Sequence, residues 1–223
     1  IQPVKQAATL AHRHGALFHC DAVQAAGRIP VDMQDLGIDF LTLSSHKIGG
    51  PQGVGALCIG ICGVSPVLLR GGGQEKSLRA GTENIAGIAG FGKAAEIARE
   101  NLTAYQSHTT SLRAPLENAL CKINSIKIYG QSVDRAPNTT LFSIPGLSSE
   151  TWLMALDLEG IAVSNGAACS SGKVEPSHVL KAMGASDDEA SAALRVSTSW
   201  DSTAEDIDAF ITAFTKIHER IRG

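Results

Sequence analysis

Lys47 is one of two residues in this sequence whose neighbours could make the side chain a nucleophile. It follows a short apolar run that ends at Ser44-Ser45, and a dense set of turn-forming residues comes after it: Gly49, Gly50, Pro51, Gly53 and Gly55. Because glycine and proline at this density interrupt strands and helices, the backbone must turn here. An amine at a strand end can reach a cleft, and it becomes nucleophilic when desolvation or neighbouring charges lower its pKa. For Lys47 alone, the alternative is a surface lysine in a glycine-rich turn.

Cys169 is the second such side chain. It lies among small residues in the stretch 165–173, which leave its thiol accessible. A loop cysteine acts as a nucleophile when its thiolate is accessible and stabilised, and a structural cysteine is the alternative. The other four cysteines, at positions 20, 58, 62 and 121, lie in apolar or helical settings typical of packing. The odd, scattered set of five argues against a disulfide framework and fits a reducing cytoplasm.

Further polar residues follow the ends of predicted strands. Asp21 ends the apolar run 16–20 and Gln24 comes three residues later, while His46 lies between the second run and Lys47. Ligands of parallel sheets bind beyond the carboxyl ends of the strands, so Asp21 and Lys47 could face one cleft.

Two arginines have settings that suit an anion. The loop 69–82 contains three consecutive glycines, Arg79 and Thr82, and it could approach an anion or be a solvated connector. Arg195 lies inside the apolar run A-A-L-R-V-S, where a buried guanidinium needs an anionic partner. That partner could be an internal carboxylate or a bound anion.

The pattern of elements predicts an α/β protein. In residues 1–100, helices alternate with strands at 16–20, 41–44 and 56–59, which favours a largely parallel sheet covered by helices. A helix over 84–101 is expected to bury one apolar face: Ile85, Ile88, Ala89, Ala95 and Ile97. Residues 101–223 predict a smaller α/β domain. Its strands are expected at 126–129, 139–144, 161–164 and 194–197, and its helices at 103–123 (interrupted or kinked near Pro115), 149–158 and 176–183. The last helix is expected to begin at a capping box of Ser202 and Glu205 and to carry one apolar stripe: Ile207, Phe210, Ile211, Phe214, Ile217 and Ile221.

Composition narrows the function classes. The chain has 223 residues, 43% hydrophobic and 18% charged, with a net charge of −3. This balance suggests neither a nucleic-acid-binding nor a membrane surface. No metal-ligand spacing is found, and no signal peptide is recognised. The start at Ile1 suggests a piece of a longer chain.

The motifs together resemble the cysteine desulfurases of the class V aminotransferase group, which are fold-type I enzymes dependent on pyridoxal 5′-phosphate (PLP). The resemblance rests on H-C-D-A-V-Q at 19–24, S-S-H-K at 44–47, G-G-G-Q-E with R-A-G-T at 71–82, A-C-S-S-G at 168–172 and R-V-S at 195–197. These motifs occur in the family's order along the whole chain. The loop ending in S-S-G-K resembles the subgroup that supplies sulfur for iron–sulfur clusters. Ala167 replaces a frequent serine, and members of the family are longer on the N-terminal side.

The resemblance implies a PLP site. Lys47 would form the Schiff base with PLP, and Asp21 would pair with the pyridine nitrogen and keep it protonated. Gln24 would bind the ring hydroxyl, while Ser44 and His46 would contact the phosphate. The expected fold is part of the large PLP-binding domain over 1–100, followed by a small domain that carries the cysteine loop.

It also implies the roles of three further residues. Thr82 would reach the phosphate of the partner subunit's cofactor, which makes a homodimer the expected assembly. Arg195 would bind the substrate carboxylate. Cys169 would take sulfur from L-cysteine, leaving a persulfide and releasing alanine.

The expected activity is therefore that of a cysteine desulfurase passing sulfur to an iron–sulfur scaffold or another acceptor. A class V aminotransferase or a selenocysteine lyase is the alternative on the same scaffold. A further alternative is an inactive fragment that needs an upstream N-terminal half, as the same or a separate polypeptide. The piece alone is expected to be inactive.

Overall fold

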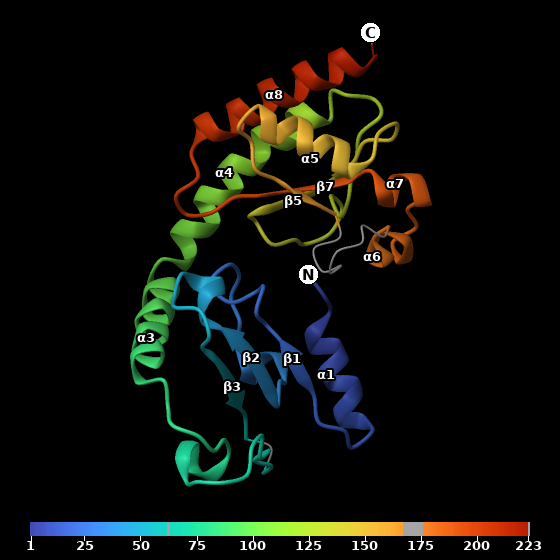
Figure 1. The fold of residues 1–223 in the computed structure, drawn as a ribbon. Helices are drawn as coiled ribbons and strands as arrows, with labels where there is room; N and C mark the ends of the chain where they lie inside the picture. The colour runs from blue at the N-terminus through green and yellow to red at the C-terminus, as the bar shows by residue number, and fades with distance from the viewer. Residues whose placement is uncertain (62, 167–175, 223) are drawn as a thin grey trace. The chain divides into compact units, whose positions relative to one another are not determined.

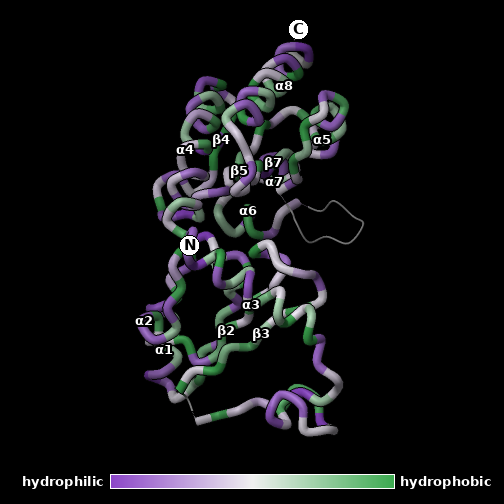
Figure 2. Tube along the Cα trace, turned by 90° about the vertical axis from the view of Figure 1, so that its left-hand side faces the viewer, coloured by the Kyte–Doolittle hydropathy of each residue, from purple (hydrophilic) through white to green (hydrophobic). Residues whose placement is uncertain are grey.

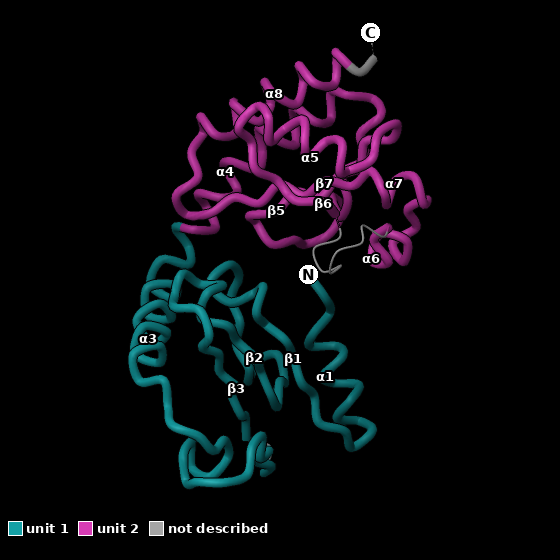
Figure 3. Tube along the Cα trace, viewed as in Figure 1, with its two compact units in different colours: residues 1–104 teal, residues 105–223 magenta. Residues whose placement is uncertain are grey.

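The computed structural model describes residues 1–61, 63–166 and 176–222, and it divides into two compact units, residues 1–104 and 105–223 (Figure 3). Each unit has its own sheet and its own apolar core. The two units are described separately below.

The first unit contains a three-stranded sheet of β1 (His19–Asp21), β2 (Phe40–Ser44) and β3 (Gly55–Ile59), in the order β1-β2-β3 (Figure 1). Strands β1 and β2 are parallel, whereas β2 and β3 are antiparallel. The α/β class is thus confirmed, but the sheet in the described part is mixed rather than largely parallel. The reason is the connection: residues 45–54 alone join β2 to β3, and a parallel crossover needs about a dozen residues or more.

Short helices connect these strands. α1 (Val4–Arg13) precedes β1, and α2 (Met33–Leu36) precedes β2. The side chain of Asp32 accepts hydrogen bonds from two backbone amides at the start of α2, and Gly37 ends the helix with φ +69°. The 3-10 helices η1 (Ser45–Ile48) and η2 (Gln74–Ser77) follow β2 and β3 respectively.

The face of α3 (Ile85–Glu100) was predicted wrongly. Its buried residues are Gly87 and Ala94, whereas Ile85, Ile88 and Ile97 are 69%, 41% and 47% exposed. Ala89 and Ala95 are exposed as well. The glycine face of α3 lies against the turn after η1: a Cβ at Gly87 would be 2.4 Å from Val54 Cγ2. Close backbone packing therefore selects the inward face, and the apolar side chains point away from the unit's described core.

Asp39 links the end of α1 to the beginning of the sheet. Its Oδ2 accepts hydrogen bonds from His12 Nε2 at 2.8 Å and from the Phe18 amide at 2.7 Å. The hydrogen bond from His12 and that from the Phe18 backbone hold the pKa of Asp39 below its usual range.

A pH-dependent loss of stability follows from Asp39. Its lowered pKa contributes stability that is complete above the unfolded-state value of about 4 and is lost as pH falls through the lower folded value. We expect Asp39→Asn to destabilise the complete protein in urea unfolding at pH 7, and the difference from wild type to shrink toward pH 3. Asp208→Asn, an exposed residue on α8, is the control. A difference of equal size at both pH values would contradict the assignment.

The second unit has a four-stranded antiparallel sheet. Its strands are β4 (Lys127–Ile128), β5 (Thr139–Ser143), β6 (Ser164–Asn165) and β7 (Ala193–Ser197), in the order β4-β5-β7-β6. The strand expected at 161–164 is instead the two-residue β6, where Ser164 pairs with Arg195.

The helices of the described part that accompany this sheet are α4 (Leu102–Leu120), α5 (Ser149–Leu158), α6 (His178–Ala182), α7 (Asp187–Ser191) and α8 (Ala204–Arg222). α4 continues through Pro115 as one helix, and its residues Leu112, Leu116 and Leu120 are buried in the core. No helix in the described ranges is both long and apolar enough to cross a membrane.

The core of the second unit is built on α8, which is amphipathic (Figure 2). Its predicted stripe is confirmed for Ile207, Phe210, Phe214 and Ile217, which are at most 3% exposed, and Phe214 stacks on Trp152 with ring centroids 4.6 Å apart. Ile211 packs at the edge of this core, and the side chain of Ile221 lies outside the described residues.

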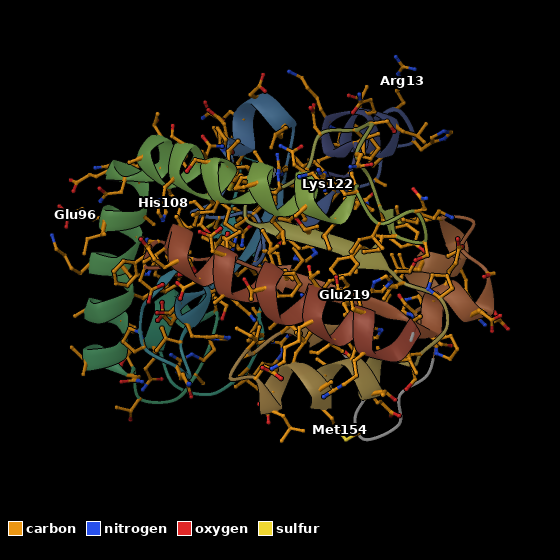
Figure 4. The ribbon with its side chains drawn as sticks, turned by 90° about the horizontal axis from the view of Figure 1, so that it is seen from above. Arg13, Glu96, His108, Lys122, Met154 and Glu219 are labelled. Carbon is orange, nitrogen blue, oxygen red and sulfur yellow. The ribbon has the colours of Figure 1, made fainter. Side chains whose placement is uncertain are left out.

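The cap of α8 lies one residue later than predicted. Thr203 and Asp206 exchange the capping-box hydrogen bonds, and Ser202 Oγ instead accepts from the Ser199 amide. His108 of α4, labelled in Figure 4, lies with Nε2 2.9 Å from the Ser202 carbonyl. This contact links α4 to the start of α8.

Candidate cofactor site

Asp21 and Ser44 end two neighbouring parallel strands. Asp21 pairs with Thr42 in the register of β1 and β2, and the Ala22 amide donates to the Thr42 carbonyl at 3.1 Å. Ser44 comes two residues after Thr42 and is the last residue of β2. Asp21 and Ser44 therefore lie at one edge of the sheet, where parallel strands present their carboxyl ends.

Lys47 follows this edge in η1. The helix begins immediately after Ser44 and ends before Gly49, whose φ of +85° is favourable for glycine. Lys47 is half-buried, and its amine has no hydrogen bond or ion pair with any described residue. The His46 Nδ1 and Ser44 Oγ atoms lie 3.0 Å apart, at hydrogen-bond distance. Ser44, His46 and Lys47, three of the predicted site residues, thus lie together because they fall within the four consecutive positions 44–47.

The segment after β1 carries the next two predicted residues. Asp21 Oδ1 accepts from the Val23 amide at 3.0 Å, so one carboxylate oxygen remains for another donor. Gln24 is exposed, and within the described chain its side-chain amide has no hydrogen-bond partner. Both side chains are available to a ligand at this edge.

Arg28 connects these two segments, and sequence reasoning missed it. Its Nη1 donates to the Gln24 carbonyl at 3.4 Å and its Nη2 to the Lys47 carbonyl at 3.2 Å. An isolated arginine in the turn A-A-G-R-I-P carries no signal that distinguishes it from a surface residue. Only the fold shows that it lies between both halves of the candidate site.

The glycine-rich turn after Lys47 is explained by packing. Ser45 is fully buried, and a Cβ at Gly50 would lie 2.2 Å from Ser45 Oγ and 3.0 Å from Ala94 Cβ on α3. The Ser45 amide donates to the Val54 carbonyl, and the Gly50 amide to the Ser45 carbonyl, both at 3.0 Å. These contacts hold η1 against α3 and so fix the backbone that carries Lys47.

Thr82 is not brought to the other site residues by the described contacts. It is exposed at the end of the loop 69–82, which closes mainly on itself. Arg79 pairs with Glu75 at 3.7 Å and donates to the Gly81 carbonyl at 2.7 Å. Gln74 Oε1 accepts from the Gly81 amide. The described contacts of this loop are thus mostly local, and most of its residues are exposed.

Arg195 lies on β7 in the second unit. Leu194 and Val196, its neighbours, pack into the core of that unit, so the alternation of the strand directs Arg195 to the opposite face. Arg195 is half-buried, and among the described residues no carboxylate lies within 4.0 Å of it. The internal salt bridge that the sequence left open thus has no partner among the described residues. Cys169 and Ala167 lie outside the described residues.

Two of the other cysteines have the character of packing residues. Burial raises the pKa of the Cys20 thiol, with a smaller contribution from the charge of Asp21, and burial also raises the pKa of Cys58. Cys121 is exposed. Within the described ranges, no three His, Cys, Asp or Glu side chains are grouped as a metal site would require.

The chemistry of the donor set at this edge fits PLP. An amine without a partner suits an aldehyde, and a carboxylate with a free oxygen suits a protonated ring nitrogen. An amide side chain suits a ring hydroxyl, and a hydroxyl beside an imidazole suits a phosphate. Lys47, Asp21, Gln24, Ser44 and His46 supply these groups in that order.

The chain is similar to known proteins in sequence and in structure. The family model for aminotransferase class-V matches residues 1–210. A cysteine desulfurase of Cereibacter sphaeroides is 44% identical over 99% of this chain and 57% of its own length. A cysteine desulfurase IscS of Clostridium botulinum is 41% identical over 100% of this chain and 57% of its own length.

A solved structure of a NifS-like protein from Rickettsia africae superimposes with a TM-score of 0.89 at 40% identity. The match covers 98% of this chain and 58% of that one. The chain thus spans less than two thirds of the length of the relatives that it matches.

Proposed function

Because the chain belongs to the class V aminotransferase family, we propose that the complete protein is a PLP-dependent cysteine desulfurase, which converts L-cysteine to L-alanine and holds the sulfur as a persulfide on Cys169. One observation carries the proposal: the half-buried amine of Lys47 has no described partner and follows the sheet edge formed by Asp21 and Ser44. Relatives at 41% and 44% identity named cysteine desulfurase support the choice of reaction.

The residues of the sheet edge would hold the cofactor. Lys47 would bind the aldehyde carbon, Asp21 the ring nitrogen and Gln24 the ring hydroxyl, with Ser44 and His46 at the phosphate. When bound, PLP supplies an electron-withdrawing ring that makes the substrate's α-proton acidic. The Lys47 amine would move that proton.

Arg195 and Cys169 would act on the substrate. The Arg195 guanidinium would bind the substrate carboxylate with two parallel hydrogen bonds, which also fixes its orientation. The Cys169 thiolate would attack the substrate sulfur, so that an S–S bond forms while the C–S bond breaks. The carbon skeleton then takes up a proton and leaves as alanine, and the persulfide passes to an iron–sulfur scaffold or another acceptor.

The proposal extends to the assembly. Thr82 would contact the phosphate in the partner subunit of a homodimer, which is consistent with its distance along the chain and its exposure outside the β1–β2 edge. We assign the first unit to the large PLP-binding domain and the second to the small domain. The cysteine content fits a reducing compartment, for which we propose the cytoplasm.

An upstream half would complete the first unit. The exposed apolar side chains of α3 and those of β3, Leu57 and Ile59, form surface that a further segment would cover. We expect residues 1–223 alone to bind PLP weakly and to release no alanine. A PLP titration of this piece, with and without the upstream half, measures the effect. Tight binding and turnover by the piece alone would contradict the expectation.

The reaction itself is tested by product analysis. The complete protein with PLP and L-cysteine should give alanine and sulfide in equal amounts when a thiol reductant is present. A class V aminotransferase would instead need a keto-acid acceptor and would give no sulfide. A selenocysteine lyase would release alanine from selenocysteine but not from cysteine. Either result would replace the proposed reaction by the corresponding alternative.

A further inference from the structure

The backbone that carries Lys47 has to be held in place if its amine is to reach a ligand bound by Asp21 and Gln24. These residues lie in two separate segments: Asp21 and Gln24 at and after the end of β1, and Lys47 after β2. The pairing of β1 with β2 ends at Asp21 and Thr42 and does not reach Gln24, whereas β2 stays paired with β3 up to Ser44. The sheet thus holds the Lys47 segment to β3, and a contact between the Gln24 segment and the Lys47 segment would fix these two relative to each other.

The planar guanidinium of Arg28 makes a contact of this kind. Its two terminal nitrogens donate to different carbonyls, Nη1 to that of Gln24 and Nη2 to that of Lys47. The Lys47 carbonyl is near the end of η1, where backbone acceptors lack helical partners, and the Gly49 and Gly50 amides both donate to Ser45 instead. Arg28 thus satisfies an acceptor that the short helix leaves open.

A packing contact reinforces the same junction. Gly27 has φ +71°, and a Cβ there would be 3.0 Å from Ile48 Cγ2, so the turn before Arg28 lies directly against the residue after Lys47. The hydrogen bond and this contact both join the segment Gly27–Arg28 to Lys47 and Ile48.

The charge of Arg28 is not used in an ion pair within the described part of the chain, where no carboxylate lies within 4.0 Å. The half-buried guanidinium of Arg28 donates to two carbonyls and to no described carboxylate. Its planar, forked set of N–H donors lets one side chain reach both acceptors. Lysine has a single ammonium on a flexible stem and cannot reproduce this planar, two-armed arrangement.

We propose that Arg28 is a positioning residue that fixes the Lys47 backbone against the segment carrying Asp21 and Gln24. The proposal rests on the proposed function, because it assigns these residues to one cofactor site. Arg28 does not touch the reacting atoms. It acts by keeping the Lys47 backbone in the place where its amine meets the ligand.

The test uses the complete protein with Arg28→Ala, Arg28→Lys and the control Arg13→Ala. Arg13 is exposed at the end of α1 and points outward in Figure 4. We expect Arg28→Ala to weaken PLP binding about tenfold, as the loss of charge-assisted hydrogen bonds predicts. Arg28→Lys should be intermediate and Arg13→Ala unchanged. An unchanged PLP affinity in Arg28→Ala would overturn the proposal.

Hydrogen exchange in the cofactor-free protein separates this inference from the proposed function. In Arg28→Ala, the Ser45 and Gly50 amides of the η1 region should exchange about tenfold faster, while the amides of β2 and β3 keep their wild-type rates. Equal rates in η1, or a general acceleration across the first unit, would reject the positioning role. If the wild-type protein fails to bind PLP, the proposed function fails, whereas the exchange rates still decide what Arg28 does.

Discussion

Replacing Lys47 by alanine in the complete protein is expected to lower alanine release from L-cysteine by about a thousandfold or more. The variant loses both the amine that binds the cofactor's aldehyde and the base that moves the α-proton. Its backbone neighbours should be preserved, because Ser45 and Gly50 hold η1 on α3 without help from the Lys47 side chain. The variant should therefore fold and lose the visible absorbance band of lysine-linked PLP.

The matched control is Lys93→Ala. Lys93 is an exposed lysine on α3 that pairs with Glu96, and such surface pairs contribute little. The Lys93→Ala variant should keep wild-type turnover and the visible absorbance band of lysine-linked PLP. Sulfide release at the wild-type rate by Lys47→Ala would show that another residue binds the cofactor.

Replacing Cys169 by serine is expected to stop the reaction at a later point. The hydroxyl has a similar size, but it is a far poorer nucleophile toward sulfur at neutral pH. PLP binding should be unchanged, because none of the residues proposed to hold the cofactor is altered. Alanine formation should fall to background.

Cys121→Ser is the control for this substitution, since Cys121 is an exposed thiol in a different part of the second unit. It should leave alanine formation at the wild-type rate. Alanine release by Cys169→Ser at that same rate would make Cys169 a structural cysteine and would favour the aminotransferase alternative.

The sequence predicted the framework of the site well, for a physical reason. A strand reads as a short apolar run, and the polar residues that follow mark its carboxyl end, so Asp21 and Lys47 could be expected near the ends of two strands. The direction of β3 relative to β2 was harder to predict, because an apolar run does not show whether a strand is parallel or antiparallel to its neighbour. The short connection 45–54 decides this direction.

The predictions from the sequence failed where contacts with other residues decide which side chains are buried or hydrogen-bonded. The apolar residues of α3 suggest an inward face, but Gly87 packs closely on Val54 and turns Ile85 and Ile88 outward. At α8, Thr203 and Asp206 satisfy the capping pattern as well as Ser202 and Glu205 do, and only the hydrogen bonds distinguish the two. Arg28 was missed because its role depends on carbonyls of distant segments. The roles of Lys47, Cys169, Thr82 and Arg195 in the reaction stay predictions.

The most direct test of the account follows the sulfur atom. The complete protein, loaded with PLP, is mixed with L-cysteine carrying isotopically labelled sulfur, quenched by thiol alkylation and analysed by peptide mass spectrometry. We expect one labelled sulfur added to the peptide that contains Cys169, formed together with alanine and absent in Lys47→Ala. Alanine formation without labelled sulfur on Cys169, or with the label on a different cysteine, would contradict it.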